Sequence, residues 1–231
     1  MKRIVYFLFL MLSVFSAVAQ NDEKLVANQL VKKNAMSIGI SQDNLDNYII
    51  SSSYFDKTTA TQMVYLIQSY LGLPVYNQVL VLAFKNDQLI SKAGQFNISI
   101  EKQVNVKNGV PAISADNAVL AALADRKLST AEMPVVLDRK ENGNKIVFSK
   151  MGISMENITA QLMWVPVEKT GMVRLAWEVY IIPKTTSDYW LVRVDAIDNS
   201  ILDIDNLTTY CNWDHPAGQH DHSTCNAAVN N

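Results

Sequence analysis

The sequence predicts an α+β fold with two halves, each an antiparallel β meander with one packed helix. Two helical stretches of apolar residues each precede a group of segments rich in β-forming residues, and short turns join those segments. The order of elements lacks the βαβ alternation of parallel sheets. A length of 231 residues suits one large or two small domains. Because the order of a helix followed by a meander occurs twice, we expect a split near residues 105–113.

The first half is predicted to contain one helix and four strands. Residues 22–36 carry apolar side chains at helical spacing, and Gly39 ends that segment. Turn-forming residues then separate runs rich in Val, Ile, Leu and Tyr. The predicted strands cover residues 48–55, 62–70, 75–84 and 88–96.

The second half is predicted to contain one helix and six strands. Residues 115–128 carry small apolar side chains that suit packing on a sheet, and residues 141–144 are a hairpin signal. The predicted strands cover residues 134–138, 145–149, 158–167, 172–182, 189–194 and 200–204. Trp164, Trp177 and Trp190 lie in these strands, where we expect core packing rather than an aromatic strip for ligand stacking.

The N-terminus has the three parts of a secretory signal peptide. A basic start at Met1 to Arg3 is followed by apolar residues 4–15 and by a small-x-small site that ends at Ala19. The apolar run is shorter than the roughly 20 residues that a membrane-spanning helix needs. We therefore expect cleavage between Ala19 and Gln20, a secreted protein in an extracellular or periplasmic space, and no membrane association after cleavage.

Composition and motifs exclude several functional classes. A net charge of −2 gives no basis for nucleic-acid binding through bulk charge, and two cysteines are too few for a disulfide-stapled miniprotein. The chain contains no His-Glu-x-x-His, Gly-x-Ser-x-Gly or glycine-rich nucleotide loop, and all three histidines follow residue 210. We therefore expect no enzyme activity and no cofactor for this chain alone.

Four acidic residues cluster near the last predicted strand. Asp195, Asp198, Asp203 and Asp205 could supply oxygen ligands for Ca²⁺, but their spacing lacks the EF-hand pattern. Solvated acids on turns and on a strand face are the favoured interpretation.

The C-terminal tail contains five possible metal ligands within fifteen residues: Cys211, His215, His220, His222 and Cys225. Thiolates and imidazoles suit Zn²⁺, although the spacing matches no specific zinc-binding motif. Because an exported protein meets an oxidising environment, a Cys211–Cys225 disulfide is favoured over a metal site or an unpaired linker. A disulfide would leave the three histidines as weak ligands for Zn²⁺ or Cu²⁺.

Two neighbouring stretches carry a resemblance to a known family. Val64–Val81 reads VYLIQSYLGLPVYNQVLV, and Lys85–Phe96 reads KNDQLISKAGQF. Together they resemble the fungalysin/thermolysin propeptide (FTP) family, whose segments read VYLxQxYxGIPVFNA and Gly-x-Val-x-Ser-x-x-Gly-x-Phe. Leu73 stands here for the usual Ile, and Tyr76 stands for Phe.

The resemblance continues downstream in a weaker form. Residues 113–115 open an alanine-rich helix, and residues 175–180 and 189–202 resemble PepSY-like strands. Between the signal peptide and the Cys/His-containing linker or tail, the resemblance therefore implies an FTP-like propeptide domain and a PepSY-like domain. The expected bounds of these four segments, in chain order, are residues 1–19, 20–108, 109–208 and 209–231.

By this resemblance the chain is expected to be the pro-region of a secreted fungalysin-type zinc metalloendopeptidase, which inhibits the catalytic domain and helps it fold. The catalytic domain and its zinc lie outside this chain, so no catalytic residue can be carried over. The tail could cross towards that domain and ligate its zinc through Cys or His. Two alternatives stay open: a stand-alone secreted inhibitor or binding module that acts in trans, and a secreted metal-binding protein.

Overall fold

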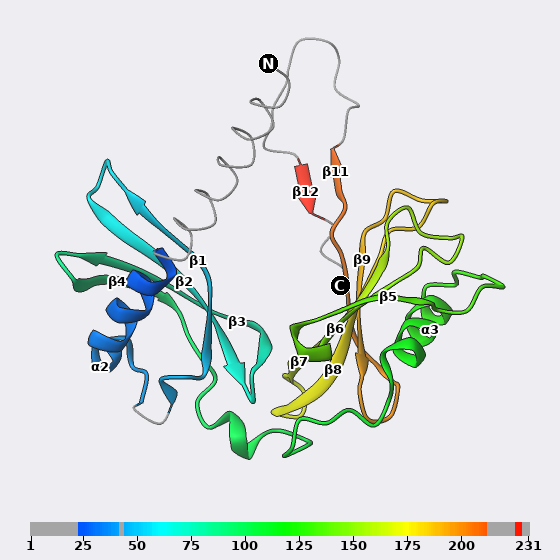
Figure 1. Ribbon diagram of the computed structural model, residues 1–231, viewed down its shortest axis with the longest axis horizontal. Coiled ribbons are helices and arrows are strands. Elements are labelled where there is room, and N and C mark those ends of the chain that lie inside the picture. The colour runs from blue at the N-terminus through cyan, green and yellow to red at the C-terminus, as the bar shows by residue number, and fades with distance from the viewer. Residues whose placement is uncertain (1–22, 42–43, 212–224, 228–231) are drawn as a thin grey trace, which may run out of the picture. The chain divides into compact units, whose positions relative to one another are not determined.

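The computed structural model describes residues 23–41, 44–211 and 225–227 (Figure 1). The chain divides into two compact units, with the boundary between Ile100 and Glu101. Both units combine helices with antiparallel strands, so the predicted α+β class is confirmed. The domain bounds drawn from the sequence, with a boundary after residue 108, remain a prediction. Among the described residues, no helix is long and apolar enough to cross a membrane.

Unit 1 contains a helix over residues 23–33, the short helix α2 and four antiparallel strands that pair in sequence order. The bounds are α2 Ala35–Ile38, β1 Tyr48–Asp56, β2 Thr61–Tyr70, β3 Leu73–Lys85 and β4 Gln88–Gly94. The four predicted strands are confirmed. Turns with positive φ at Leu71, Gly72, Asn86 and Asp87 join β2 to β3 and β3 to β4.

The core of unit 1 lies between the helices and one face of the sheet (Figure 1). Alternate residues of each strand point to this face, as the two-residue period of a strand requires. The buried set is Ala27, Leu30, Val31, Ala35, Ile38, Ile40, Val64, Leu66, Leu80, Leu82 and Phe84. The other face of the sheet receives no helix from the described part of unit 1.

The helix predicted over residues 22–36 is interrupted at Asn34. The Asn34 side chain donates to the carbonyls of Leu30 at 2.9 Å and Asp87 at 3.0 Å, and it accepts from the Leu89 amide at 3.2 Å. These contacts tie the helix end to the β3–β4 turn, because asparagine competes for backbone partners. Gly39 ends the following helix α2 at φ 87°, as predicted.

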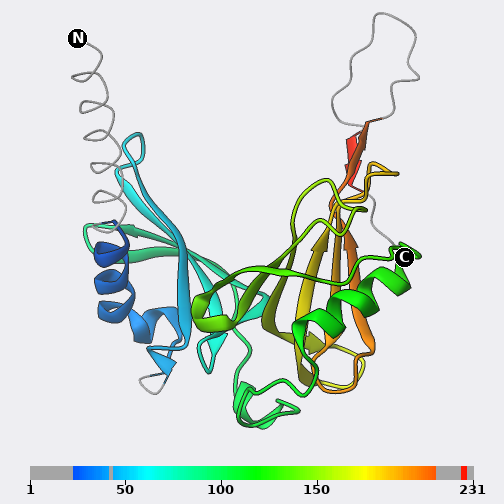
Figure 2. The ribbon, with the colours of Figure 1, turned by 45° about the vertical axis from the view of Figure 1, so that its right-hand side comes forward.

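Unit 2 contains one α-helix on one face of a six-stranded antiparallel sheet (Figures 1 and 2). The strand order is β5-β6-β7-β8-β9-β10. The bounds are α3 Ala115–Asp125, β5 Val136–Lys140, β6 Lys145–Phe148, β7 Ile158–Val167, β8 Met172–Ile181, β9 Trp190–Asp195 and β10 Ile201–Asn206. Two short 3₁₀ turns, η2 Ile100–Lys102 and η3 Glu141–Gly143, lie at the start of the unit and in the β5–β6 hairpin.

Core packing was predicted for three tryptophans, and the structure confirms it for two of them. Trp164 is fully buried, and Trp177 is buried with its indole N–H donating to the Ile113 carbonyl at 2.8 Å. Trp190 is half-buried, and the guanidinium of Arg126 lies 4.7 Å from its ring centre. Small residues on α3 allow the helix to pack closely on the sheet face that carries these tryptophans.

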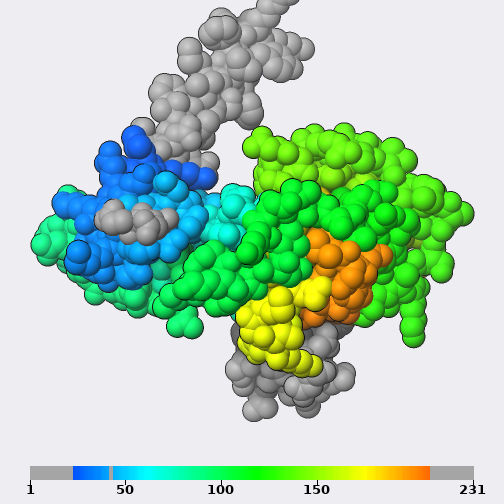
Figure 3. Space-filling view, turned by 90° about the horizontal axis from the view of Figure 1, so that it is seen from below, coloured from blue at the N-terminus to red at the C-terminus, as the bar shows by residue number. Residues whose placement is uncertain are grey.

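The segment before α3 is fixed to the turn between β9 and β10 (Figure 3). The amides of Ala112 and Ile113 both donate to the Ala196 carbonyl at 2.8 Å. Beyond β10, strands β11 Thr209–Cys211 and β12 Cys225–Ala227 form a separate antiparallel pair.

Candidate functional site

The first candidate site is the face of the sheet in unit 1 that receives no helix from the described part of that unit, here called the open face. It consists of side chains that alternate with the buried ones along β1, β2 and β3: Ile49, Tyr54, Met63, Tyr65, Ile67, Val79 and Val81. Strand register aligns them in rows. Ile49 lies opposite Ile67, which lies opposite Val79. These side chains are aliphatic, thioether or aromatic, whereas Ser52 and Asp56 lie on the same face opposite Tyr65 and Thr61, so the surface is apolar at its centre and has a charged group at its end.

Several open-face side chains are accessible to a partner. Ile49 is 39% exposed, Tyr54 is 44% exposed and Val79 is 38% exposed. The rings of Tyr54 and Tyr65 stack with centroids 6.2 Å apart and planes inclined by 23°. Such pre-ordered tyrosines lose little conformational entropy on binding, and aromatic residues are typical anchors of protein interfaces. The open face is therefore suited to docking against another protein surface.

The second candidate is a charged cluster on unit 2, centred on Arg193. Arg193 Nε lies 3.0 Å from Glu178 Oε2, Nη1 lies 2.6 Å from Asp203 Oδ2 and Nη2 lies 2.7 Å from Asp205 Oδ2. The side chain of Arg193 is only 1% exposed, whereas Asp203 and Asp205 are partly exposed. A guanidinium is the only side chain with enough donors for three carboxylates in one plane.

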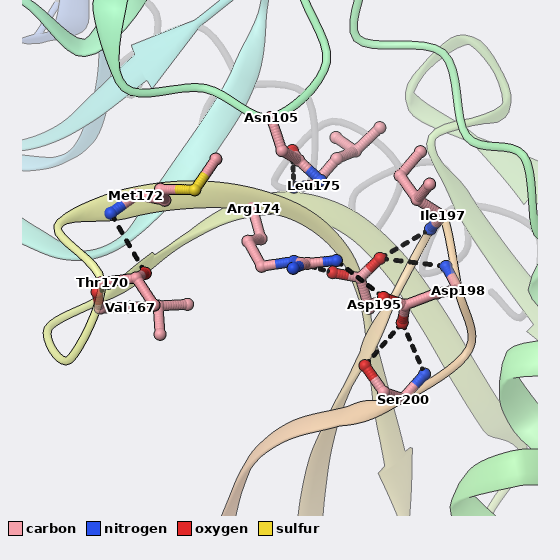
Figure 4. Close-up of polar contacts among 10 residues, drawn as sticks. All are labelled: Asn105, Val167, Thr170, Met172, Arg174, Leu175, Asp195, Ile197, Asp198 and Ser200. Carbon is pink, nitrogen blue, oxygen red and sulfur yellow. Dashed lines mark hydrogen bonds and ion pairs between the residues drawn. The ribbon is translucent and has the colours of Figure 1, made fainter.

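A second arginine organises the turn after β9 (Figure 4). Arg174 Nε donates to Asp195 Oδ2, and Arg174 Nη2 donates to Asp198 Oδ2 at 2.8 Å. The other oxygen of Asp195 accepts from the amides of Ile197 at 2.8 Å and Asp198 at 3.2 Å. Ser200 donates to Asp198 Oδ1 from its hydroxyl at 2.5 Å. These bonds fix the turn to which the segment before α3 is attached.

Two carboxyl groups of these clusters have shifted pKa values. Burial raises the pKa of Glu178 above its ordinary value, and the attraction of Arg193 only partly offsets that effect. Hydrogen bonds from Ser200, followed by the charge of Arg174, lower the pKa of Asp198. The clusters therefore contain one carboxyl that resists ionisation and one that favours it.

The predicted acidic cluster is brought together in part, but its partners are arginines. The four aspartates form two groups, one on Arg174 and one on Arg193, and no group of three or more possible metal ligands occurs among the described residues. The favoured interpretation of solvated acids is wrong for Asp195, which is fully buried. No role was predicted for the two arginines, and their position within apolar strands is the signal in the sequence that points to a network of this kind.

The predicted tail site lies mostly outside the described residues. His215, His220 and His222 are not described, and neither is the predicted cleavage site at Ala19 and Gln20. At the ends of the tail, the backbone register of β11 and β12 places Cys211 opposite Cys225. The disulfide and the metal site both remain predictions.

Comparisons with known proteins bear on unit 1. Residues 46–96 match the family model described as Fungalysin/Thermolysin Propeptide Motif, a range that includes all of β1 to β4. Among solved structures, the chain is similar to the Bacillus megaterium YpeB C-terminal domain at 12% identity and a TM-score of 0.39. That likeness covers 82% of this chain, which spans 65% of the other chain. No curated protein matches significantly. The predicted resemblance to the propeptide family is thus confirmed for residues 46–96.

Proposed function

We propose that this chain is the pro-region of a secreted zinc metalloendopeptidase of the thermolysin/fungalysin type, which it inhibits and helps to fold. The observation that carries the proposal is the family match over residues 46–96. That range contains every strand of unit 1 and every residue of the open face. A pro-region needs a surface that binds the folded enzyme, and the open face supplies an apolar one.

In this proposal the open face packs on the catalytic domain. The stacked Tyr54 and Tyr65 and the row of Ile49, Ile67 and Val79 are removed from water on binding, which provides the driving force. The helices pack on the other face and fix the conformation of the sheet, so the binding surface is already formed in the free protein. The same preformed surface favours the native enzyme during folding, because binding stabilises a folded state over an unfolded one.

The test is inhibition of a fungalysin-type catalytic domain from the source organism by the chain from Gln20 onwards. We expect slow, tight inhibition with a dissociation constant on the order of 1 nM, as for good interfaces of standard size. Denatured catalytic domain should regain activity faster when the chain is present. Loss of inhibition without loss of folding assistance would separate the two roles.

Matched variants locate the surface. Tyr54→Ser and Val79→Ser shorten side chains of the open face, and each should weaken inhibition about tenfold or more. Leu71→Asn is the control, because Leu71 is 50% exposed in the β2–β3 turn, off the open face, at a φ of 51° that asparagine accepts. Equal weakening by the control, or no inhibition by the unmodified chain at about 1 µM, would contradict the proposal.

We further infer that the signal peptide is removed between Ala19 and Gln20 on export and that Cys211 and Cys225 then form a disulfide. The register of β11 and β12 supports this pairing, because directly opposed strand residues lie at a Cα separation that a disulfide can bridge. Intact mass after alkylation, with and without prior reduction, tests it. Alkylation of both thiols in the unreduced secreted protein would instead favour the metal site or the unpaired linker.

A further inference from the structure

Strand β5 gives the sheet of unit 2 an open edge. It pairs with β6, and no other described strand pairs with it. All five of its residues are exposed, including Val136 and Leu137, and Val135 just before it is exposed as well. An unpaired edge presents backbone donors and acceptors that can be completed by an added strand.

A pocket of about 420 Å³ adjoins this edge, between β5, the start of α3 and the β5–β6 hairpin. Its apolar floor consists of the buried side chains Ile146, Phe148, Leu162 and Trp177. Val136 and Arg139 line the pocket from β5. The floor and volume suit one large apolar side chain, since binding pockets combine an apolar lining with a few polar groups at the rim.

Arg139 supplies the charge at this rim. Its register partner on β6 is Ile146, which places Arg139 on the same sheet face as the pocket floor. Among the described residues, the guanidinium of Arg139 takes part in no ion pair. Asp116 also lines the pocket, but it lies in the first turn of α3, where the helix dipole already compensates a negative charge. A carboxylate on a ligand would therefore find an available partner.

We propose that the edge of β5 and this pocket bind a short extended segment of a partner protein that carries a large apolar side chain and a carboxylate two residues away. The segment adds to β5 through backbone hydrogen bonds, the apolar side chain enters the pocket beside Val136, and the carboxylate accepts from Arg139. The two side chains share one face because strand side chains alternate. The bulge between Val136 and Asp138 limits the added segment to a short one. The site lies outside residues 46–96 and does not depend on the proposed function.

The probe is the fluorescein-labelled peptide Thr-Val-Thr-Phe-Thr-Glu-Thr, whose binding is followed by anisotropy. We expect saturable binding with a dissociation constant on the order of 100 µM. Replacing the Glu of the probe with Gln, or its Phe with Ala, should weaken binding about fivefold or more. The indole N–H resonance of Trp177 should shift on titration, because that residue lines the pocket.

Two neighbouring residues of β5 provide matched variants. Arg139→Glu should weaken binding of the probe at least about fivefold, whereas Lys140→Glu should change it less than about twofold. Both variants make the same charge reversal, but Lys140 lies on the opposite sheet face, where it pairs with Asp138 at 3.7 Å. Val136→Trp, which fills the pocket from its wall, should weaken binding as well and serves if Arg139→Glu fails to fold.

Three results would overturn the proposal. The first is no saturable binding below about 1 mM. The second is equal binding of the Glu and Gln probes, or equal weakening by the two charge reversals. The third is concentration-dependent dimerisation that is lost in Arg139→Glu and Val136→Trp while the probe does not bind, which would assign the edge to a second copy of this chain.

Discussion

Arg193 on β9 and Glu178 on β8 are register partners, and their Nε and Oε2 atoms lie 3.0 Å apart. The guanidinium is almost fully buried and also contacts Asp203 and Asp205 of β10. One cation thus joins three strands through side chains as well as through the backbone ladders. Replacing such a network by apolar groups can be neutral, but removing one member leaves buried charge without compensation.

Loss of the central cation should be severely destabilising. Arg193→Met leaves Glu178 without its partner and the two aspartates with reduced compensation, so we expect a loss of about 3–5 kcal/mol in the free energy of unfolding. Glu178→Gln keeps an acceptor for Arg193 and should cost less than about 1.5 kcal/mol. Urea unfolding at neutral pH measures both. A loss below about 1 kcal/mol for Arg193→Met would show that the network is not coupled to global folding.

Glu178 should make stability decline as pH rises. Its pKa is raised in the folded protein, mainly by burial, so the folded state holds the proton more tightly than the unfolded state does. Stability from this group is complete below the ordinary value of 4.5 and is lost as pH rises from there through the raised pKa. The stability of Glu178→Gln relative to the unmodified protein should therefore increase across that window. An opposite slope in paired unfolding curves would contradict the burial effect.

The two carboxylates on Arg174 should differ in their importance. Asp195 is fully buried and also accepts two backbone amides, so Asp195→Asn should cost about 3 kcal/mol. Asp198 is 51% exposed, and solvent screening limits the cost of Asp198→Asn to about 0.5 kcal/mol. Thermal or urea unfolding of the two isosteric variants provides the comparison. Equal losses would mean that burial does not control the strength of these ion pairs.

Asp198 should contribute a pH dependence opposite to that of Glu178. Its pKa is lowered in the folded state, chiefly by the Ser200 hydrogen bonds, so its contribution is present above the ordinary value of 3.8. That contribution is lost as pH falls through the lowered pKa. The difference between the unmodified protein and Asp198→Asn should therefore vanish on acidification. A difference that persists in strong acid would have to come from something other than the carboxylate charge.

Gly94 should be indispensable to the third strand pair of unit 1. It lies opposite Leu80 at φ 85°, and a Cβ atom there would lie 2.1 Å from the Val79 carbonyl oxygen. Gly94→Ala should cost about 2–4 kcal/mol through this clash and the strained backbone. Gly72→Ala is the control, because Gly72 has φ 74° with nothing within 4 Å of the added atom. It should cost about 1 kcal/mol, and an equal loss for both variants would remove the clash from the explanation.

The sequence predicted the strands well because their periodicity and turns are local features. The hairpin signal at residues 141–144 corresponds to positive φ angles at Asn142 and Gly143, which those residue types favour. The break of the first helix at Asn34 could not be predicted, because its cause is a contact with a turn 53 residues away. Strand ends also moved by a few residues, as in β5, which covers 136–140 rather than 134–138.

The candidate site was less predictable than the fold. The role of Arg193 depends on the register of β8, β9 and β10, which composition and spacing do not encode. The open face required knowledge of which strand face the helices cover. The pocket beside β5 depends on the packing of α3 against strands that are distant in sequence. In contrast, the family resemblance was carried by contiguous residues of β2, β3 and β4 and could be found directly.

In the proposed function, the open face of unit 1 binds a metallopeptidase catalytic domain. The most direct test is a calorimetric titration of the chain from Gln20 onwards into a fungalysin-type catalytic domain from the same source, repeated with Tyr54→Ser and Leu71→Asn. We expect one-to-one binding on the order of 1 nM that is weakened about tenfold by Tyr54→Ser and unchanged by Leu71→Asn. No binding at about 1 µM, or binding that is insensitive to Tyr54→Ser, would contradict it.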